Sequence, residues 1–201
     1  MIDTFCAASL NNMIYYPLDK NIFSKFSSNE LNKFKEEVRE YYENIIVGAN
    51  TIIKDNPSLL NNKKTNKRFI IDKYANLDIN SNIFNIKPQN TYVFILKNDE
   101  EYISKLRKKK VNVIECTKND VLIKLKEHLK GNTIIEGGSR TINYFLKNKF
   151  IDNIGLIIFP FLLPKNGKPL FFNTDNYYLE LLEQMEIDKQ YIFIKYRVIK
   201  K

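Results

Sequence analysis

The chain has 201 residues, of which 44% are hydrophobic, so it is long enough for a packed domain and too apolar for a disordered polypeptide. Its formal net charge is +9, from 32 Lys and Arg against 23 Asp and Glu, but only five of the basic residues are Arg. Lysine-rich solvated faces account for this surplus better than a nucleic-acid site does, because the aromatic residues follow core-like patterns and are not interleaved with Arg. We therefore expect no nucleic-acid partner.

The sequence carries no signal of export or membrane insertion. No basic N-terminal region precedes a long apolar stretch, and the longest apolar runs, such as residues 154–163, are too short to cross a bilayer. Cys6 and Cys116 lie far apart in apolar contexts and are expected to be free thiols. We expect a cytoplasmic protein with no membrane partner.

Strand-like apolar runs alternate with helical patterns along the chain. The predicted strands cover residues 2–8, 44–47, 68–71, 91–96, 111–115, 132–135, 153–159 and 191–198. Apolar stripes at helical spacing predict helices marked by Leu31, Phe34, Val38 and Tyr41; by Ile103 and Leu106; by Val121, Leu122, Leu125 and Leu129; and by Ile142, Phe145, Leu146 and Phe150. Ser27 and Glu30 are expected to form a capping box before the first of these helices, and Gly131 to end the third.

This alternation of strands and helices predicts an α/β fold with a mostly parallel sheet. The C-terminal third is richer in strands, which predicts antiparallel strands at the edge of that sheet. No internal repeat and no interdomain linker interrupts the pattern. Residues 1–201 are therefore expected to form a single domain.

Several common chemistries lack their residues in this chain. One histidine and two distant cysteines cannot supply the three or four ligands of a zinc site, so no metal is expected. The sequence has no G-x-S-x-G elbow, no P-loop and no G-x-G-x-x-G after a strand. Two glycine-bearing turns remain as candidate sites.

The first candidate turn lies in IIEGGSRTINYFL, residues 134–146. A buried strand ends at Glu136, Gly137 and Gly138 follow, and a helix opens near Ser139. Ligands of α/β folds bind beyond the carboxyl ends of strands, and the free N–H groups of a first helical turn favour a phosphate. Arg140 in that turn strengthens this interpretation. A plain strand–turn–helix corner explains the glycines equally well.

The second candidate turn lies in IIVGANTIIKDNPSL, residues 45–59. Gly48 ends a predicted strand, Thr51 follows, and Asp55-Asn56-Pro57 stops any helix. This turn also lies at the carboxyl end of a strand. Gly48 and Pro57 therefore bracket a second segment that is able to shape a site.

These residues resemble a known family, the pyrimidine reductases of riboflavin biosynthesis. VGANTIIKDNPSL resembles that family's V-G-x-x-T-x-x-x-D-[DN]-P-x-L turn, and the block that begins IIEGGSRTINYFL and ends GKPLF is similar to its E-G-G block. RFIID at residues 68–72 matches the strand between them, and AASL at 7–10 matches the start of A-x-S-L-D-G. The resemblance covers nearly the whole chain.

The resemblance implies an α/β, dihydrofolate-reductase-like three-layer domain, in most cases a homodimer. It implies NADPH-dependent reduction of a ribosylamino-pyrimidine 5′-phosphate to the ribitylamino compound. The substrate would be 5-amino-6-(5-phosphoribosylamino)uracil or its 2,5-diamino pyrimidinone counterpart. No zinc-deaminase signature accompanies the reductase pattern in this sequence.

The resemblance also assigns site residues. Those expected to contact NADPH are Ala8, Thr51, Asp55, Gly137, Gly138, Ser139, Arg140 and Thr141, within a cofactor segment that extends to Tyr144. Those expected to contact the substrate are Arg39, Leu59, Lys63 and Glu136. Asp55 and Glu136 are the candidate catalytic carboxylates, and the sequence does not decide which of them handles a proton.

The chain departs from the family pattern at two places. Asn11 and Asn12 replace the Asp and Gly of S-L-D-G, and Asn62 replaces a basic residue next to Lys63. Two alternatives therefore stay open. One is a reductase of the same fold acting on another pterin or pyrimidine, and the other is a non-catalytic nucleotide-binding relative.

Overall fold

The computed structural model describes residues 1–19, 21–61, 65–172 and 176–199. The chain separates into two compact units. Unit 1 comprises Met1–Arg39 and Ile134–Lys201, and unit 2 comprises Glu40–Thr133. The single domain expected from the sequence stays a prediction.

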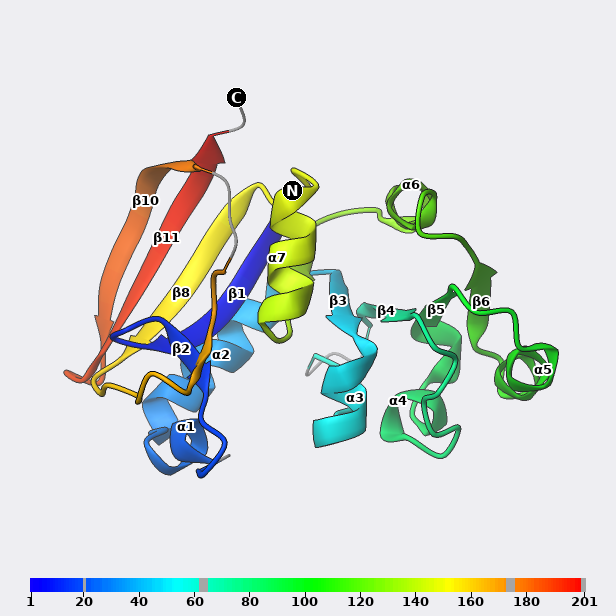
Figure 1. Ribbon diagram of the computed structural model, residues 1–201, viewed down its shortest axis with the longest axis horizontal. Helices are drawn as coiled ribbons and strands as arrows, with labels where there is room; N and C mark the ends of the chain where they lie inside the picture. The colour runs from blue at the N-terminus through cyan, green and yellow to red at the C-terminus, as the bar shows by residue number, and fades with distance from the viewer. Residues whose placement is uncertain (20, 62–64, 173–175, 200–201) are drawn as a thin grey trace. The chain divides into compact units, whose positions relative to one another are not determined.

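Unit 1 is built on a sheet in which parallel and antiparallel strands meet. β1 (Ile2–Ser9) pairs in parallel with β8 (Asn153–Phe159), and β7 (Thr133–Ile135) lies on the other side of β1. β11 (Tyr191–Ile199) runs antiparallel to β8, and β10 (Tyr178–Ile187) runs antiparallel to β11 at the sheet edge (Figure 1). The predicted antiparallel C-terminal strands are confirmed, although β10 is absent from the predicted elements.

Two helices cover opposite faces of this sheet, α2 (Asn29–Glu40) behind β1 and α7 (Ser139–Lys147) in front of it (Figure 1). Phe34 of α2 packs against Phe5 and Phe193, with ring centroids 6.3 and 5.1 Å away. The predicted apolar stripe of α7 is confirmed for Ile142, Phe145 and Leu146, which are all buried, whereas Phe150 is buried but lies beyond the helix end at Lys147. Shorter elements complete unit 1: α1 (Ile22–Lys25), and the two-stranded sheet of β2 (Met13–Tyr15) and β9 (Lys168–Pro169).

The start and the end of α2 differ from the prediction. Ser28, not Ser27, caps the helix, because the Ser28 hydroxyl accepts a hydrogen bond of 3.1 Å from the backbone N–H of Leu31. The Ser27 hydroxyl instead donates to the carbonyl of Phe23. Tyr41 lies beyond the last turn of the helix and is 58% exposed, so its predicted place in the buried stripe is wrong.

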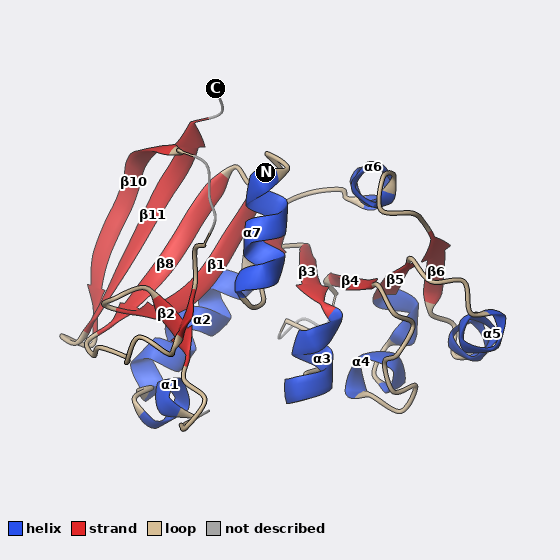
Figure 2. Ribbon diagram, viewed as in Figure 1, coloured by secondary structure: helices blue, strands red, loops and turns tan. Residues whose placement is uncertain are grey.

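Unit 2 contains four parallel strands in the order β3, β4, β5 and β6. Their bounds are β3 (Asn44–Gly48), β4 (Lys67–Asp72), β5 (Thr91–Ile95) and β6 (Asn112–Glu115). The helical segments between and after them are α3 (Ala49–Asp55), α4 (Asn82–Asn85), η1 (Pro88–Asn90), α5 (Glu100–Lys108) and α6 (Val121–His128). The predicted alternation of strand and helix is confirmed (Figure 2).

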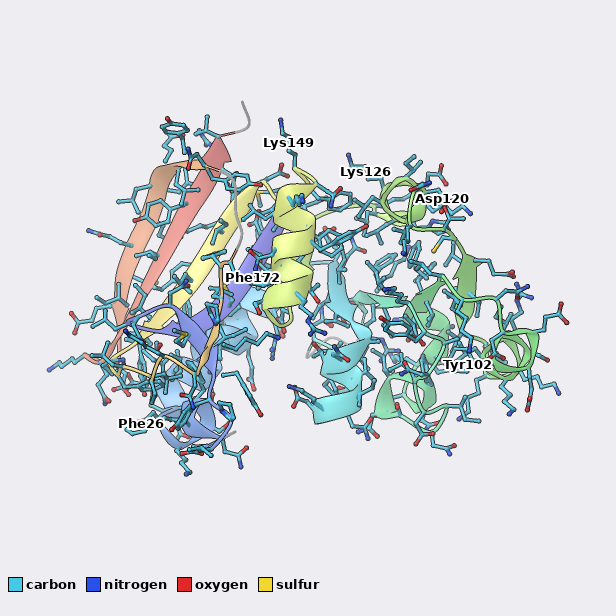
Figure 3. All side chains as sticks on the ribbon, viewed as in Figure 1. Phe26, Tyr102, Asp120, Lys126, Lys149 and Phe172 are labelled. Atoms are coloured by element: carbon cyan, nitrogen blue, oxygen red, sulfur yellow. The ribbon has the colours of Figure 1, made fainter. Side chains whose placement is uncertain are left out.

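One buried polar group inside unit 2 is satisfied by a side chain that is distant in sequence. Asp72, at the end of β4, is fully buried and accepts a hydrogen bond of 3.0 Å from the hydroxyl of Tyr102, which Figure 3 labels. Burial, followed by the Asp72 carboxylate, raises the pKa of Tyr102. One predicted boundary is wrong: α6 ends at His128 with Leu129 as its C-cap, so Gly131 lies beyond the helix end.

None of the helices in the described part of the chain is long and apolar enough to span a membrane.

Candidate active site

The first group of candidate residues lies in unit 1, where β7 runs into α7. β7 ends at Ile135, Glu136 and Gly137 follow, and Gly138 is the N-cap of α7. Gly137 has a φ of +146°, a conformation that L side chains rarely adopt. Glycine at 137 is therefore required by the backbone itself.

Gly138 needs a different explanation. Its φ of −76° is open to any residue, and a Cβ built on it would meet nothing within 4 Å among the described residues. Neither backbone geometry nor internal packing accounts for glycine at this position. Open space beside a helix N-terminus leaves room for a ligand to approach the backbone closely.

The first turn of α7 offers hydrogen-bond donors to such a ligand. No side chain caps the helix, so its N-terminal N–H groups and its dipole are available to an anion. Ser139 is fully buried, and its hydroxyl has no partner among the described residues. Arg140 is exposed and Thr141 partly exposed in the same turn. These groups suit the phosphates of a nicotinamide dinucleotide.

Arg39 and Glu136, both expected to contact substrate, bind each other. The Arg39 Nε donates to Glu136 Oε1 at 2.6 Å, and its Nη2 donates to Oε2 at 2.8 Å. The side chain of Glu136 is only 12% exposed, whereas that of Arg39 is 44% exposed. Partial burial lowers the pKa of Arg39, but the charge and hydrogen bonds of Glu136 outweigh that effect and leave the pKa raised.

Lys35 joins this pair, and the sequence analysis missed it. It lies one helical turn before Arg39 on α2, with its Nζ 3.4 Å from the Ser27 hydroxyl and 5.6 Å from the centroid of the Phe159 ring. Burial, followed by repulsion from Arg39, lowers the pKa of Lys35, and Glu136 opposes that shift. Lys35 thus brings a second cation to the Arg39–Glu136 pair, and Glu36 on the same helix adds a second carboxylate near Arg39.

The end of β1 keeps a defined turn despite its altered sequence. Asn11 Nδ2 donates to the Leu163 carbonyl at 2.6 Å, and Asn11 Oδ1 accepts from the Leu163 N–H at 3.0 Å. Asn12 takes a φ of +64°, which glycine adopts freely and asparagine tolerates better than most residues. Ala8, expected at the cofactor, is buried just before this turn. The two asparagines thus form a defined turn at the positions where the family pattern has Asp and Gly.

The second group of candidate residues lies in unit 2, on and after α3. Thr51 and Asp55 are four residues apart on this helix and therefore share a face; Thr51 is partly exposed and Asp55 exposed. Asn56 ends the helix in the left-handed conformation, and Leu59 has a φ of +54°. Lys63 lies outside the described residues.

In the structure, Arg39 contacts Glu136 directly. The residues expected at the cofactor, Gly137–Thr141, follow Glu136 along the chain and lead into the first turn of α7. In unit 2 the structure places Thr51 and Asp55 on one helix face, with Leu59 in the loop that follows. The spacing of Lys35 from Arg39, four residues along a predicted helix, is the signal that would have identified the second cation.

Comparison with known proteins first defines the class. The fold is similar to that of dihydrofolate reductase from Enterococcus faecalis, with a TM-score of 0.55 and 11% identity over 100% of this chain and 97% of that one. Together with the mixed sheet and the α7 turn, this is the dihydrofolate-reductase-like class of α/β proteins, and the predicted fold class is confirmed.

The family follows from the sequence. The family model described as the RibD C-terminal domain matches residues 19–193, and the chain belongs to this family. The riboflavin biosynthesis protein RibD of Aquifex aeolicus is 33% identical over 141 residues, which are 67% of this chain and 39% of that protein. This chain therefore spans well under half the length of that relative.

Solved structures agree on the fold. RibD of Acinetobacter baumannii gives a TM-score of 0.82 at 19% identity over 99% of this chain and 58% of that one. A pyrimidine reductase-like protein of Corynebacterium diphtheriae gives 0.82 at 20% identity over 100% of this chain and 92% of that one. The riboflavin biosynthesis reductase Rib7 of Saccharomyces cerevisiae gives 0.70 at 17% identity over 98% and 89%.

Proposed function

We propose that this chain is an oxidoreductase that uses NADPH to reduce a ribosylamino-pyrimidine 5′-phosphate to the ribitylamino compound in riboflavin biosynthesis. Membership of the RibD C-terminal domain family supports this assignment. The observation that carries it is the α7 turn, where Gly138 leaves open space at an uncapped helix N-terminus directly after the Arg39–Glu136 pair. A phosphorylated substrate and a dinucleotide both need anion-binding groups of this kind.

Each group has a role in this proposal. When bound, NADPH supplies the hydride, and the N–H groups of the α7 turn hold its phosphates. Arg39 and Lys35 attract the phosphorylated substrate, and Glu136 accepts hydrogen bonds from its polar groups. Because both carboxyl oxygens of Glu136 already accept hydrogen bonds from Arg39, Asp55 is the better proton relay. Its side chain has no hydrogen-bond partner among the described residues, whereas Glu136 is engaged twice.

The direct test is turnover. The purified chain should oxidise NADPH, and NADH less efficiently, in the presence of one of the two ribosylamino-pyrimidine phosphates, the 2-amino or the 2-oxo form. Thermal shift with NADPH alone separates the alternatives, because a ligand that binds the native state raises its apparent stability. NADPH binding without turnover of either pyrimidine would favour another pterin or pyrimidine substrate. If the chain neither binds NADPH nor turns over either pyrimidine, a non-catalytic relative would be favoured.

We also propose that the chain forms a homodimer through one face of the unit 1 sheet. Phe193 points toward α2, so its neighbours Ile192 and Ile194 on β11 point to the opposite face. Residues paired with them in register extend this surface across β8, and β10 adds further apolar side chains. The apolar face comprises Leu156, Ile158, Leu179, Leu181, Ile192, Ile194 and Tyr196, all partly or largely exposed.

Such a face suits a second copy of the same chain. Its members are uncharged, although Gln184 and Glu186 of β10, paired in register with Ile194 and Ile192, lie beside them on the same face. A two-fold interface places identical patches against each other, so apolar meets apolar. In Figure 1 this is the face of β8, β11 and β10 on the side where α7 lies over β1.

The cytoplasmic location expected from the sequence remains a prediction of this proposal.

A further inference from the structure

Arg68 is the largest fully buried side chain of the described residues, and it has no carboxylate partner among them. It lies on β4 in unit 2. Its Nη1 donates to the carbonyl of Ser58 at 2.8 Å, and its Nη2 donates to the carbonyls of Ile86 and Lys87 at 2.7 and 2.6 Å. A buried cation is thus neutralised by three backbone dipoles instead of a negative charge.

This arrangement is unfavourable as a means of stabilising a core. Removing a charge from water costs free energy, and a hydrophobic side chain of similar volume fills such a space without that cost. Burial lowers the pKa of Arg68 to about 10, which still leaves the guanidinium charged at neutral pH. The three carbonyls that it holds therefore explain its presence better than packing does.

The carbonyl of Ser58 belongs to the corner that follows α3, residues 55–59. This corner has no regular secondary structure after Asp55, and two of its residues, Asn56 and Leu59, have positive φ values of 41° and 54°. Among the described residues, only one of these two has a backbone hydrogen bond of its own, because the N–H of Asn56 donates to the Ile52 carbonyl at 3.0 Å. The corner needs support from outside.

Two asparagines supply the rest of that support. Asn66 Nδ2 donates to the carbonyl of Leu59 at 2.8 Å. Asn82 donates to the carbonyl of Asn56 through Nδ2 at 2.9 Å, and its backbone N–H donates to the Asn56 side chain at 2.8 Å. The carbonyls of residues 56, 58 and 59 are thus each held by a side chain from elsewhere in unit 2.

We infer that Arg68, assisted by Asn66 and Asn82, is a positioning residue that fixes the corner of Asp55 to Leu59 for the pyrimidine substrate. This inference rests on the proposed function, in which Asp55 and Leu59 belong to the site. Arg68 itself touches neither ligand. It acts by holding the Ser58 carbonyl and thereby setting the direction in which the flanking side chains point.

The test compares Arg68→Lys and Asn82→Ala with the control Asn85→Ala. Lysine keeps the charge but replaces a planar fork with a single ammonium, which does not reach three carbonyls in fixed directions. Asn82→Ala removes one support from an exposed position, so the variant should fold even where Arg68→Lys does not. Asn85 lies on the same helix and binds the Asn80 carbonyl and Lys109 instead of the corner.

Two measurements decide the outcome. Hydrogen exchange of the amides of Asn56 and Asn61, which donate to the Ile52 carbonyl and to Asn66 Oδ1, should accelerate in Arg68→Lys and Asn82→Ala and not in Asn85→Ala. The KM for the pyrimidine phosphate should rise about tenfold in Arg68→Lys and about threefold in Asn82→Ala, with kcat within about twofold of the wild type. Rescue of KM in Asn82→Gln would support positioning by this side chain.

The inference is overturned if folded Arg68→Lys and Asn82→Ala keep both the wild-type exchange and the wild-type KM. It is equally overturned if exchange accelerates while KM stays constant, because the contacts are then structural only. If Arg68→Lys does not fold, Asn82→Ala decides alone. If the wild-type chain turns over neither pyrimidine, the proposed function is refuted, and so is this inference as stated. Hydrogen exchange then still shows separately whether these side chains hold the corner.

Discussion

Arg39 and Glu136 are 97 residues apart in sequence and face each other through two parallel hydrogen bonds of 2.6 and 2.8 Å. One comes from α2 and the other follows β7, so the pair fastens a helix on one side of the unit 1 sheet to the carboxyl end of a strand. The sequence analysis assigned both residues to the substrate, and the structure shows that each is already the partner of the other.

Arg39→Lys should lower kcat/KM for the pyrimidine phosphate by about tenfold or more, because lysine loses the fork that aligns Glu136 and grips an anion. NADPH affinity and Tm should hardly change, since a half-exposed pair contributes at most about 1 kcal/mol. Arg197→Lys is the control, because Arg197 forms another exposed ion pair in unit 1, with Glu180. Full turnover in both Arg39→Lys and Arg39→Ala would show that Arg39 is an ordinary surface residue.

Gly138→Val should fold normally and lose NADPH binding. The φ of −76° admits valine and the space beside the residue is open, so only a ligand that uses that space is excluded. Gly155→Ala is the matched control, because its Cβ would approach Phe193 and Phe5 to 3.2 and 3.3 Å. That variant should lower Tm and keep cofactor affinity. Normal NADPH titration in folded Gly138→Val would mean that the α7 turn is a plain corner.

Asn11→Asp restores the residue that the family carries, yet it should destabilise this chain at neutral pH. Asn11 donates to the Leu163 carbonyl at 2.6 Å, and a carboxylate cannot donate. The expected loss is about 1–3 kcal/mol for the unsatisfied contact. Repulsion from the carbonyl raises the pKa of the new carboxyl in the folded state, so the loss should shrink as pH falls through that raised value. Thermal unfolding from pH 4 to 8 measures this, and a Tm difference independent of pH would refute it.

Lys35→Met should increase stability and weaken substrate binding. The folded state lowers the pKa of Lys35, so the unfolded chain binds more protons between that lowered value and the ordinary lysine pKa. The free-energy cost of burying the charged ammonium has its full value below the folded-state pKa, and it decreases as pH rises through that pKa. The increase in the free energy of unfolding caused by Lys35→Met should therefore be largest near neutral pH and smaller near pH 10. The KM for the phosphorylated substrate should rise. Lys33→Met, an exposed change on the same helix, should do neither.

Ile194→Lys should convert the dimer to a monomer, because it places a charge within the apolar face of unit 1, between Ile192 and Tyr196 on β11 and beside Leu156 on β8. Ile199→Lys is the control, since Ile199 is exposed on β11 and is paired with Tyr178 on the opposite face. Light scattering at micromolar concentration gives both masses. A wild-type chain that is already a strict monomer would remove the dimer from the proposal.

Much of the architecture is readable from the sequence because most strands are buried on both faces. β3, β4 and β5 appear as continuous apolar runs, and so does β8, which makes them easy to recognise. β10 escapes recognition because nine of its ten residues are exposed and glutamates recur along it. Its bulge between Leu181 and Glu183 also interrupts the alternation that would mark a strand.

The chemistry of the candidate site is only partly readable in the same way. The glycines of the α7 turn are visible in the sequence, because the need for backbone freedom fixes the residue type. The contact of Arg39 with Glu136 and the three carbonyls around Arg68 depend on segments that meet only after folding. No local pattern in the sequence shows which buried arginine will find carbonyls instead of a carboxylate.

The exposed edge strand β10 has a consequence for how copies of this protein meet one another. Its outer side has no strand partner among the described residues, so the outward N–H and C=O groups form a template onto which further strands can add. Glu180, Glu183 and Glu186 place negative charge along that edge, and like charges keep a second β10 from aligning beside it. Replacing the three glutamates by glutamine removes this repulsion while Leu182 and Met185 remain exposed. Such a variant should therefore form fibrils from this edge while the core of unit 1 stays folded.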